Sequence, residues 1–171
     1  MDIYFKDGYG KLYEGIEGGT AEIFRFQTED GEIKHQFIKR KIPSAITNGE
    51  ELYDLITPYG YGGPLVIDAK EGKRKRLCQN FQGAFQRYCN ENHIVSEFVR
   101  FHPIIKNADD FFEIYHPTCI RHTLGTNLRD YDDPIQEEFS KRNSIEEEQN
   151  ENDLNHRYRW PYTEIYCDHY S

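Results

Sequence analysis

The stretch LCQNFQGAFQRYCNENHIVSEFVRFHP, residues 77–103, contains a helix signal followed directly by a strand signal. Residues 94–101 predict a strand that stops at His102, because the next residue is a proline and cannot donate to a strand ladder. Before this strand, apolar residues recur at three- and four-residue spacing and so lie along one helix face. They are Leu77, Cys78, Phe81, Ala84, Phe85, Tyr88 and Cys89.

Four strands are predicted between residue 21 and this helix, after a short N-terminal strand. The first two flank a turn that ends in Asp30 and Gly31, and two β-like runs around Asp-Gly indicate a hairpin. The five glycines of residues 8–19 predict a short N-terminal strand with loose turns before them. The four predicted strands are residues 21–27, 32–42, 52–56 and 65–67.

Strands and helices also alternate after residue 103. Residues 108–115 predict a short helix whose first turn is acidic, which suits the helix dipole, and residues 118–128 predict another strand. A further helix is predicted from residues 132–134, where a proline occupies an early helical position, to about residue 143. This alternation, after a hairpin, predicts a mixed sheet of the α/β (α+β) class.

Composition narrows the function classes. With 171 residues the chain is long enough for one core, and an aromatic content of 15 % predicts a core filled by rings. The formal charge of −9 disfavours non-specific binding to nucleic acid or to an anionic membrane, since both need a cationic surface. The first residues form no secretory signal and no apolar run approaches the ~20 residues of a membrane span, so we expect a soluble, cytoplasmic protein.

The four cysteines predict buried free thiols rather than a metal site. Cys78, Cys89, Cys119 and Cys167 are widely scattered, with no CxxC or CxxxC pair among them. Because zinc ligands normally come in close pairs, the sequence predicts no metal.

The last part of the chain differs in character from the rest. Residues 145–153 are acidic, polar and unpatterned, a composition that cannot bury enough apolar surface to fold. Residues 145–171 hold seven acidic residues against two basic ones. We therefore divide the chain into a folded part, residues 1–144, and an acidic polar tail, residues 145–171, that is either disordered or docked on the folded part.

The segment TPYGYGGP, residues 57–64, resembles a binding loop in its glycine content. In phosphate-binding loops, successive backbone N–H groups point at the anion, usually at the start of a helix. Here a predicted strand follows, and the spacing of Gly60, Gly62 and Gly63 matches neither G-x-G-x-x-G nor the P-loop. A strand-to-strand turn with glycines at positive φ and stacked tyrosines is the better interpretation.

Two other features each allow a functional and a structural interpretation. Lys70 and the basic residues 73–76 either hold a phosphate-bearing ligand or form a solvated turn before the helix. His102 is either a catalytic base or part of a structural His-Pro turn. The structural interpretation is the more common one in both cases. Ser96 and Glu97 are expected on opposite faces of their strand, so they cannot line one pocket.

Three segments, in this order, resemble one protein family. They are LYDLITPYGYGGPLV at residues 52–66, CNENHIVSEFVRFHPIIKN at 89–107 and CIRHTLGTNL at 119–128. The family is that of the FemAB-like bacterial acyltransferases, which are related to the Fem aminoacyltransferases of peptidoglycan synthesis and are also described as GNAT-type. The resemblance extends from about residue 3 to about residue 144.

The resemblance implies a GNAT-like fold, a twisted mixed sheet flanked by helices, and makes residues 1–144 the first of the family's two such halves. It implies transfer of an acetyl or aminoacyl group, from acetyl-CoA or aminoacyl-tRNA, to an amine of a peptidoglycan precursor or surface sugar. Arg100 becomes a candidate anchor for an anionic acceptor, because a guanidinium binds carboxylate or phosphate through two hydrogen bonds. The turn would help to form the acceptor-side cleft, with candidate residues Thr57, Tyr59, Tyr61 and Gly62.

The chain also departs from the family pattern. His102 stands where the Fem enzymes have an acidic residue, so it is a candidate binding residue to which no role carries over, and we assign no catalytic residue. The GNAT pyrophosphate loop, Arg/Gln-x-x-Gly-x-Gly/Ala, is absent from the sequence. Residues 141–144 run into acidic sequence where a second half is expected, which predicts a truncated product without the donor site. The alternative to an acyltransferase is therefore a non-catalytic half-domain that binds a ligand or partner, with homodimerisation as one mode.

Overall fold

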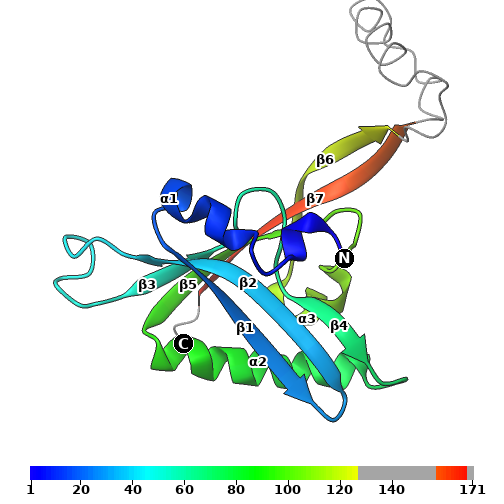
Figure 1. Cartoon of the computed structure of the whole chain (residues 1–171), viewed down its shortest axis with the longest axis horizontal. Helices are drawn as coiled ribbons and strands as arrows, with labels where there is room; N and C mark the ends of the chain where they lie inside the picture. Colours follow the sequence, from blue (N-terminus) through cyan, green and yellow to red (C-terminus); the bar gives the residue numbers. More distant parts are fainter. Residues whose placement is uncertain (127–156, 169–171) are drawn as a thin grey trace, which may run out of the picture.

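One sheet forms the centre of the computed structural model, which describes residues 1–126 and 157–168, and the long helix α2 covers one face of that sheet (Figure 1). In chain order the elements are η1 (Ile3–Phe5), η2 (Gly10–Tyr13), α1 (Glu14–Glu17), β1 (Thr20–Thr28), β2 (Gly31–Lys41), β3 (Tyr53–Ile56), β4 (Leu65–Ala69), α2 (Arg74–Glu91), β5 (Ile94–Phe101), η3 (Asp109–Phe111), α3 (Phe112–Tyr115), β6 (Thr118–Thr126) and β7 (Arg157–Asp168).

The sheet is mixed, as predicted. Its described strands follow the order β1-β2-β3-β5-β7-β6, with β4 paired to β2 beside this path. Strands β3 and β5 run parallel, and the other pairs are antiparallel. β3 pairs with residues 38–41 of β2 and β4 pairs with residues 31–34, so the two strands pair with different parts of the same strand. The chain must therefore leave the sheet between β3 and β4, and residues 57–64 make this connection.

The hairpin predicted around Asp30 and Gly31 is confirmed. β1 and β2 pair in register from Thr20 with Lys39 to Thr28 with Gly31. Gly31 has φ 145°, and a Cβ there would lie 2.1 Å from the Asp68 carbonyl oxygen of β4. The glycine is thus required both by the turn and by the close approach of β4.

The core lies between the sheet and α2 and is filled by rings, as the composition predicts. Phe81 and Phe85 of α2 stack with their centroids 5.5 Å apart, and Phe24 of β1 contacts both. The predicted helical face is largely confirmed, with Ala84 and Tyr88 at its half-buried margin. The buried cluster comprises Ile33, Phe37, Leu55, Val66, Leu77, Cys78, Phe81, Phe85, Cys89, Ile94, Val99, Phe101, Phe111 and Tyr115.

Three polar side chains are buried within this aromatic core. The Glu97 carboxylate contacts Nε2 of His35 and accepts a hydrogen bond from the Tyr115 hydroxyl at 3.1 Å. Their exposed fractions are 1 %, 0 % and 4 %, so solvent does not reach the group. The Glu97 carboxylate is thus buried together with two side chains that contact it, which offsets the cost of removing it from water.

The cysteines follow the prediction only in part. Cys78 and Cys89 are buried free thiols, and burial raises the pKa of the Cys78 thiol to about 11 and that of Cys89 further. Cys119, in contrast, is exposed on β6. The prediction of a buried thiol is therefore wrong for Cys119, whose strand lies toward the margin of the sheet.

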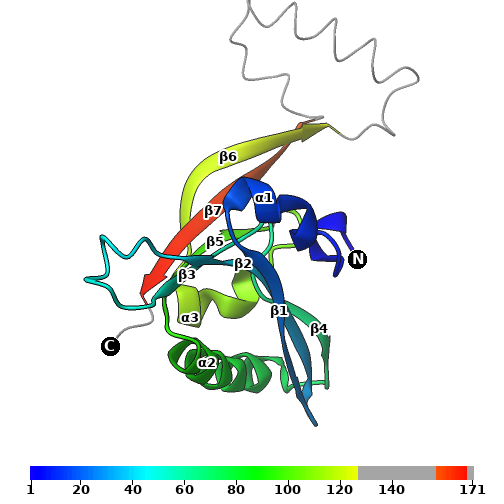
Figure 2. The same ribbon diagram turned by 60° about the vertical axis from the view of Figure 1, so that its left-hand side comes forward.

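The N-terminal segment covers the sheet face opposite α2, and here the prediction of a short strand is wrong (Figures 1 and 2). Residues 3–17 instead form two short 3₁₀ helices and one α-helical turn. Lys34 on β2 causes this in part, because its buried ammonium group bonds to the Phe5 carbonyl oxygen and to the Asp7 carboxylate. A strand would direct its carbonyl groups to a neighbouring strand rather than to side chains of the sheet below.

The last described strands extend away from the body of the molecule (Figures 1 and 2). β6 confirms the strand expected after residue 118, and β7 lies between β5 and β6. β7 belongs to the predicted tail, so this part of residues 145–171 pairs with the sheet. The helix predicted at residues 132–143 lies outside the described residues, and the division at residue 144 stays a prediction.

Removal of one core ring should destabilise the whole fold. We expect Phe81→Ala to lower the free energy of unfolding by about 3–5 kcal/mol, because Phe81 is fully buried and contacts rings from β1, β2 and η3. Chemical denaturation measures this change, with exposed Gln82→Ala as the control, which should change stability by less than about 0.5 kcal/mol. Equal effects of the two substitutions would contradict the placement of α2.

Candidate functional site

The segment of residues 57–64 forms the predicted strand-to-strand turn. Gly60 and Gly63 adopt φ values of 97° and 80°, which glycine reaches without strain. The Gly62 amide donates to the Arg100 carbonyl oxygen at 2.8 Å, and the buried Asn107 side chain donates to the carbonyl oxygens of Gly62 and Pro64. These bonds satisfy the backbone of the turn and hold it against the end of β5.

The structure brings the six predicted binding residues together around this turn. Arg100 is bonded to Thr57 twice: its amide donates to Oγ1 at 3.0 Å and its Nη2 to the carbonyl oxygen at 2.7 Å. The Tyr61 ring lies 5.2 Å from that of His102, centroid to centroid. Tyr59 is the most exposed of the six, with an exposed fraction of 63 %. Together with Gly62 these residues form what we call the turn cluster.

The N-terminal segment adds three tyrosines to the turn cluster. The Tyr9 hydroxyl donates to the Tyr59 carbonyl oxygen at 2.8 Å, and the Tyr13 ring stacks on the Tyr59 ring. Tyr4 contacts the rings of Tyr61 and His102 edge-on. Sequence reasoning missed these residues because it placed them in a strand, although their dense tyrosine content was a signal of ring packing.

His102 has a structural environment. Its Nδ1 accepts hydrogen bonds from the amides of Ile104 and Ile105, both at 3.2 Å, and its Nε2 lies 3.6 Å from the Asp2 carboxylate. Burial lowers the pKa of the imidazole. An Nδ1 that accepts two amide protons holds the His-Pro turn together, and this geometry favours the structural interpretation over that of a catalytic base.

The Arg100 side chain is fixed by a hydrogen bond, but part of its guanidinium group has no hydrogen-bond acceptor among the described residues. Its Nε is buried without a hydrogen-bond partner, and within its guanidinium group it is Nη2 that donates to a described residue. The Glu17 carboxylate is 3.8 Å from Nη2, too far for a hydrogen bond. A buried donor without a partner costs about 1–3 kcal/mol, so this arrangement is unusual for an internal arginine.

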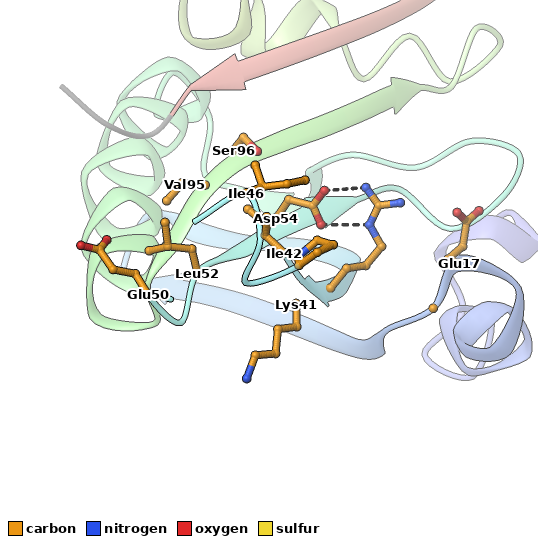
Figure 3. Close-up of a pocket in the computed structure, with 12 residues that line it drawn as sticks. Glu17, Lys41, Ile42, Ile46, Glu50, Leu52, Asp54, Val95 and Ser96 are labelled. Carbon is orange, nitrogen blue, oxygen red and sulfur yellow. Dashed lines mark hydrogen bonds and ion pairs between the residues drawn. The ribbon is translucent and has the colours of Figure 1, made fainter. Parts of the chain in front are cut away.

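An open cleft lies next to Glu17 on the same face of the sheet (Figure 3). It has a volume of about 930 Å³, and its apolar lining comes from β5 and from the connection between β2 and β3. Its polar groups are the pair of Arg40 and Asp54, the hydroxyl of Ser96, and the side chains of Glu17, Lys41 and Glu50. This size suits a small organic ligand.

The polar floor of the cleft is an arginine–carboxylate pair. Arg40 donates to Asp54 through Nε at 2.9 Å and Nη2 at 2.5 Å, drawn as dashed lines in Figure 3. Both side chains stay partly exposed, so the pair contributes little to stability but presents charge to the cleft. Ser96 lines this cleft whereas Glu97 points into the core, which confirms that they lie on opposite faces.

The basic side chains of the first turn of α2 form internal ion pairs. Arg74 forms a two-bond pair with Asp110, and Arg76 forms one with Asp30. Lys75 contacts Glu113 at 2.7 Å. These contacts favour the structural interpretation, since an incoming phosphate would have to displace carboxylates that already fit the guanidinium groups.

Comparison with protein-family models, curated proteins and solved structures found no match to this chain. Among the described residues, no group of three His, Cys, Asp or Glu side chains is arranged to hold a metal ion. No described helix is long and apolar enough to cross a membrane. The assignment of function therefore depends on the site itself.

The turn should tolerate no side chain at Gly60. A Cβ there would lie 2.3 Å from Cε1 of Tyr4, and φ is positive, whereas Gly72 has φ 69° with nothing within 4 Å. We expect Gly72→Ala to cost about 1 kcal/mol from backbone strain and Gly60→Ala to cost at least ~1 kcal/mol more from overpacking. Thermal and chemical unfolding of the two variants provides the comparison, and equal losses would argue against the packing of Tyr4 on the turn.

His102 should make stability depend on pH. The pKa of its folded form is lowered from 6.5, so the unfolded chain binds more protons and stability falls as pH drops below about 6.5. His102→Asn should reduce this dependence, because the amide oxygen accepts backbone N–H bonds without titrating. The measurement is the free energy of unfolding from pH 7.5 to 5, with exposed His116→Asn as the control. An unchanged pH slope in His102→Asn would refute the role of Nδ1.

Proposed function

We propose that this chain is an acyltransferase-family protein of the FemAB-like type, whose described part binds the amine acceptor. The GNAT-like form of the mixed sheet is part of this proposal. The observation that carries it is the cleft, in which carboxylates and an arginine–carboxylate pair lie beside apolar side chains, and whose Glu17 contacts Arg100 of the turn cluster. Such a site offers charge to an ammonium group and apolar surface to the carbon skeleton that bears it.

The proposed chemistry needs few protein groups. The neutral amine nitrogen attacks the carbonyl carbon of the acyl donor, the bond to the donor's sulfur or oxygen breaks, and the amine proton passes to a base or to water. Most of the acceleration then comes from holding the amine against the acyl carbon. Glu17, Glu50 and Asp54 line the cleft, and their carboxylates would attract and orient the acceptor's ammonium form before it loses a proton.

We also propose the identity of the acyl donor. Acetyl-CoA or aminoacyl-tRNA would supply the acyl group, as the family resemblance implies, and the acceptor would be an amine of a cell-wall or surface-sugar precursor. A negatively charged chain fits a small acceptor better than a long stretch of nucleic acid. A tRNA donor would therefore have to bind through a local surface.

The test is titration calorimetry with a soluble peptidoglycan precursor that carries a free amine, followed by mass spectrometry after addition of acetyl-CoA. We expect the precursor to bind and Asp54→Asn to weaken its affinity about tenfold, which corresponds to about 1.4 kcal/mol. Glu113→Gln is the matched control, because this carboxylate pairs with Lys75 away from the cleft and its loss should leave affinity unchanged. Absence of binding by the precursor would reject the acceptor site.

The alternative is a half-domain that binds the ligand without catalysis. It is favoured by His102 and Thr57, whose side chains are engaged in internal hydrogen bonds rather than presented to the cleft. The same experiment separates the two functions. Acylated product supports the transferase, whereas precursor binding with no heat from acetyl-CoA and no product supports the binding half-domain.

A further inference from the structure

We infer that Arg100 binds an anionic group of the acceptor, and that Glu17 stands in for this group when the site is empty. The inference deepens the proposed function, on which it rests for the nature of the ligand. It adds the chemical feature that Arg100, behind Glu17 of the cleft lining, would recognise: a carboxylate or a phosphate oxyanion.

The first support is the incomplete bonding of the Arg100 guanidinium. A guanidinium has five N–H donors in a planar fork. In Arg100, Nη2 donates to the Thr57 carbonyl oxygen, while Nε is buried without a partner. Buried polar groups nearly always have a hydrogen-bond partner, and one without it calls for an explanation such as an absent ligand. The bond to Thr57 fixes the group in advance, so little ordering remains for a ligand to impose.

The second support is the contrast with other arginines of the described residues. Arg40, Arg74 and Arg76 each meet a carboxylate through two hydrogen bonds, from Asp54, Asp110 and Asp30. Among the side chains that the structure describes, the carboxylate nearest the Arg100 guanidinium is that of Glu17, at 3.8 Å. A ligand oxyanion could approach a guanidinium to the usual 2.7–2.9 Å of a charged hydrogen bond, so it would bind more closely than Glu17 does.

The third support is the position of Glu17 between the cleft and Arg100. Glu17 is the last residue of α1, which ends at Gly18 with φ 72°, and both residues line the cleft. The side chains of Glu17 and Arg100 are 14 % and 15 % exposed, so the ion pair still meets solvent. A change of the Glu17 rotamer would thus open a path from the cleft to the guanidinium without movement of the sheet.

The test measures binding of two simple anions, inorganic phosphate and acetate, to the full chain by NMR chemical-shift titration. We expect Glu17→Gln to tighten the binding of the preferred anion about threefold, since a competing ion pair is removed. Arg100→Lys should weaken it about tenfold, because a lysine cannot provide the planar fork. Glu71→Gln and Arg87→Lys, both on the surface of the connection to α2 or of α2 itself, are the controls and should change affinity by less than about twofold.

The outcomes divide clearly. Tighter binding in Glu17→Gln with weaker binding in Arg100→Lys supports the inference, and the preferred anion then indicates whether the acceptor carries a phosphate or a carboxylate. The inference is overturned if neither anion binds, or if Glu17→Gln behaves like Glu71→Gln. If Arg100→Lys does not fold, the anion affinity of Glu17→Gln alone decides. An affinity equal to that of the wild type overturns the inference, and a higher affinity supports it.

The result is separable from the acyl-transfer assay, because no donor or amine is present. Anion binding at Arg100 without binding of the amine-bearing precursor would reject the proposed function and support the anion site. Binding of the precursor, with an affinity that neither Glu17→Gln nor Arg100→Lys changes, would reject the anion site and support the proposed function.

Discussion

The hydrogen bonds between the turn of residues 57–64 and the end of β5 are the constraint on which the site depends. β3 and β4 both pair with β2, so the chain has to cross from one level of that strand to the other. The Thr57 amide donates to the Phe98 carbonyl oxygen and the Gly62 amide to that of Arg100, which anchors both ends of the crossing. The N-terminal segment then packs on this anchored turn through Tyr9 and Tyr4.

Stability and site chemistry are supplied by opposite faces of the same sheet. On one face the aromatic side chains of α2, β1 and β2 bury apolar surface, the dominant favourable term in folding. On the other face Lys34, Arg40 and Arg100 bring positive charge close to the sheet, where the N-terminal segment and the cleft meet them. Because side chains alternate along a strand, one strand serves both faces: β5 directs Glu97 into the core and Ser96 into the cleft.

The geometry favours binding over direct catalysis by the turn cluster. His102 and Thr57 hold backbone groups in place, so the proposed transfer would depend on positioning of the acceptor rather than on a dedicated base in the cluster. Arg100 is the exception, because no described carboxylate meets its guanidinium through two hydrogen bonds, as one does at Arg40, Arg74 and Arg76. The cleft, Glu17 and Arg100 thus lie side by side, from the open cleft to a half-buried cation.

The sequence by itself determined the elements whose signals are local. The three- and four-residue spacing predicted α2, and Asp30 and Gly31 predicted the first hairpin. The positive φ values expected in the turn are found at Gly60 and Gly63 but not at Gly62. It also selected the turn residues and Arg100, which the structure places together. Only the tertiary structure decided which distant segments meet: the N-terminal helices on the sheet, β7 between β5 and β6, and Glu17 beside Arg100. Periodicity and turn chemistry act over a few residues, whereas these contacts follow from how the two faces of the sheet are covered.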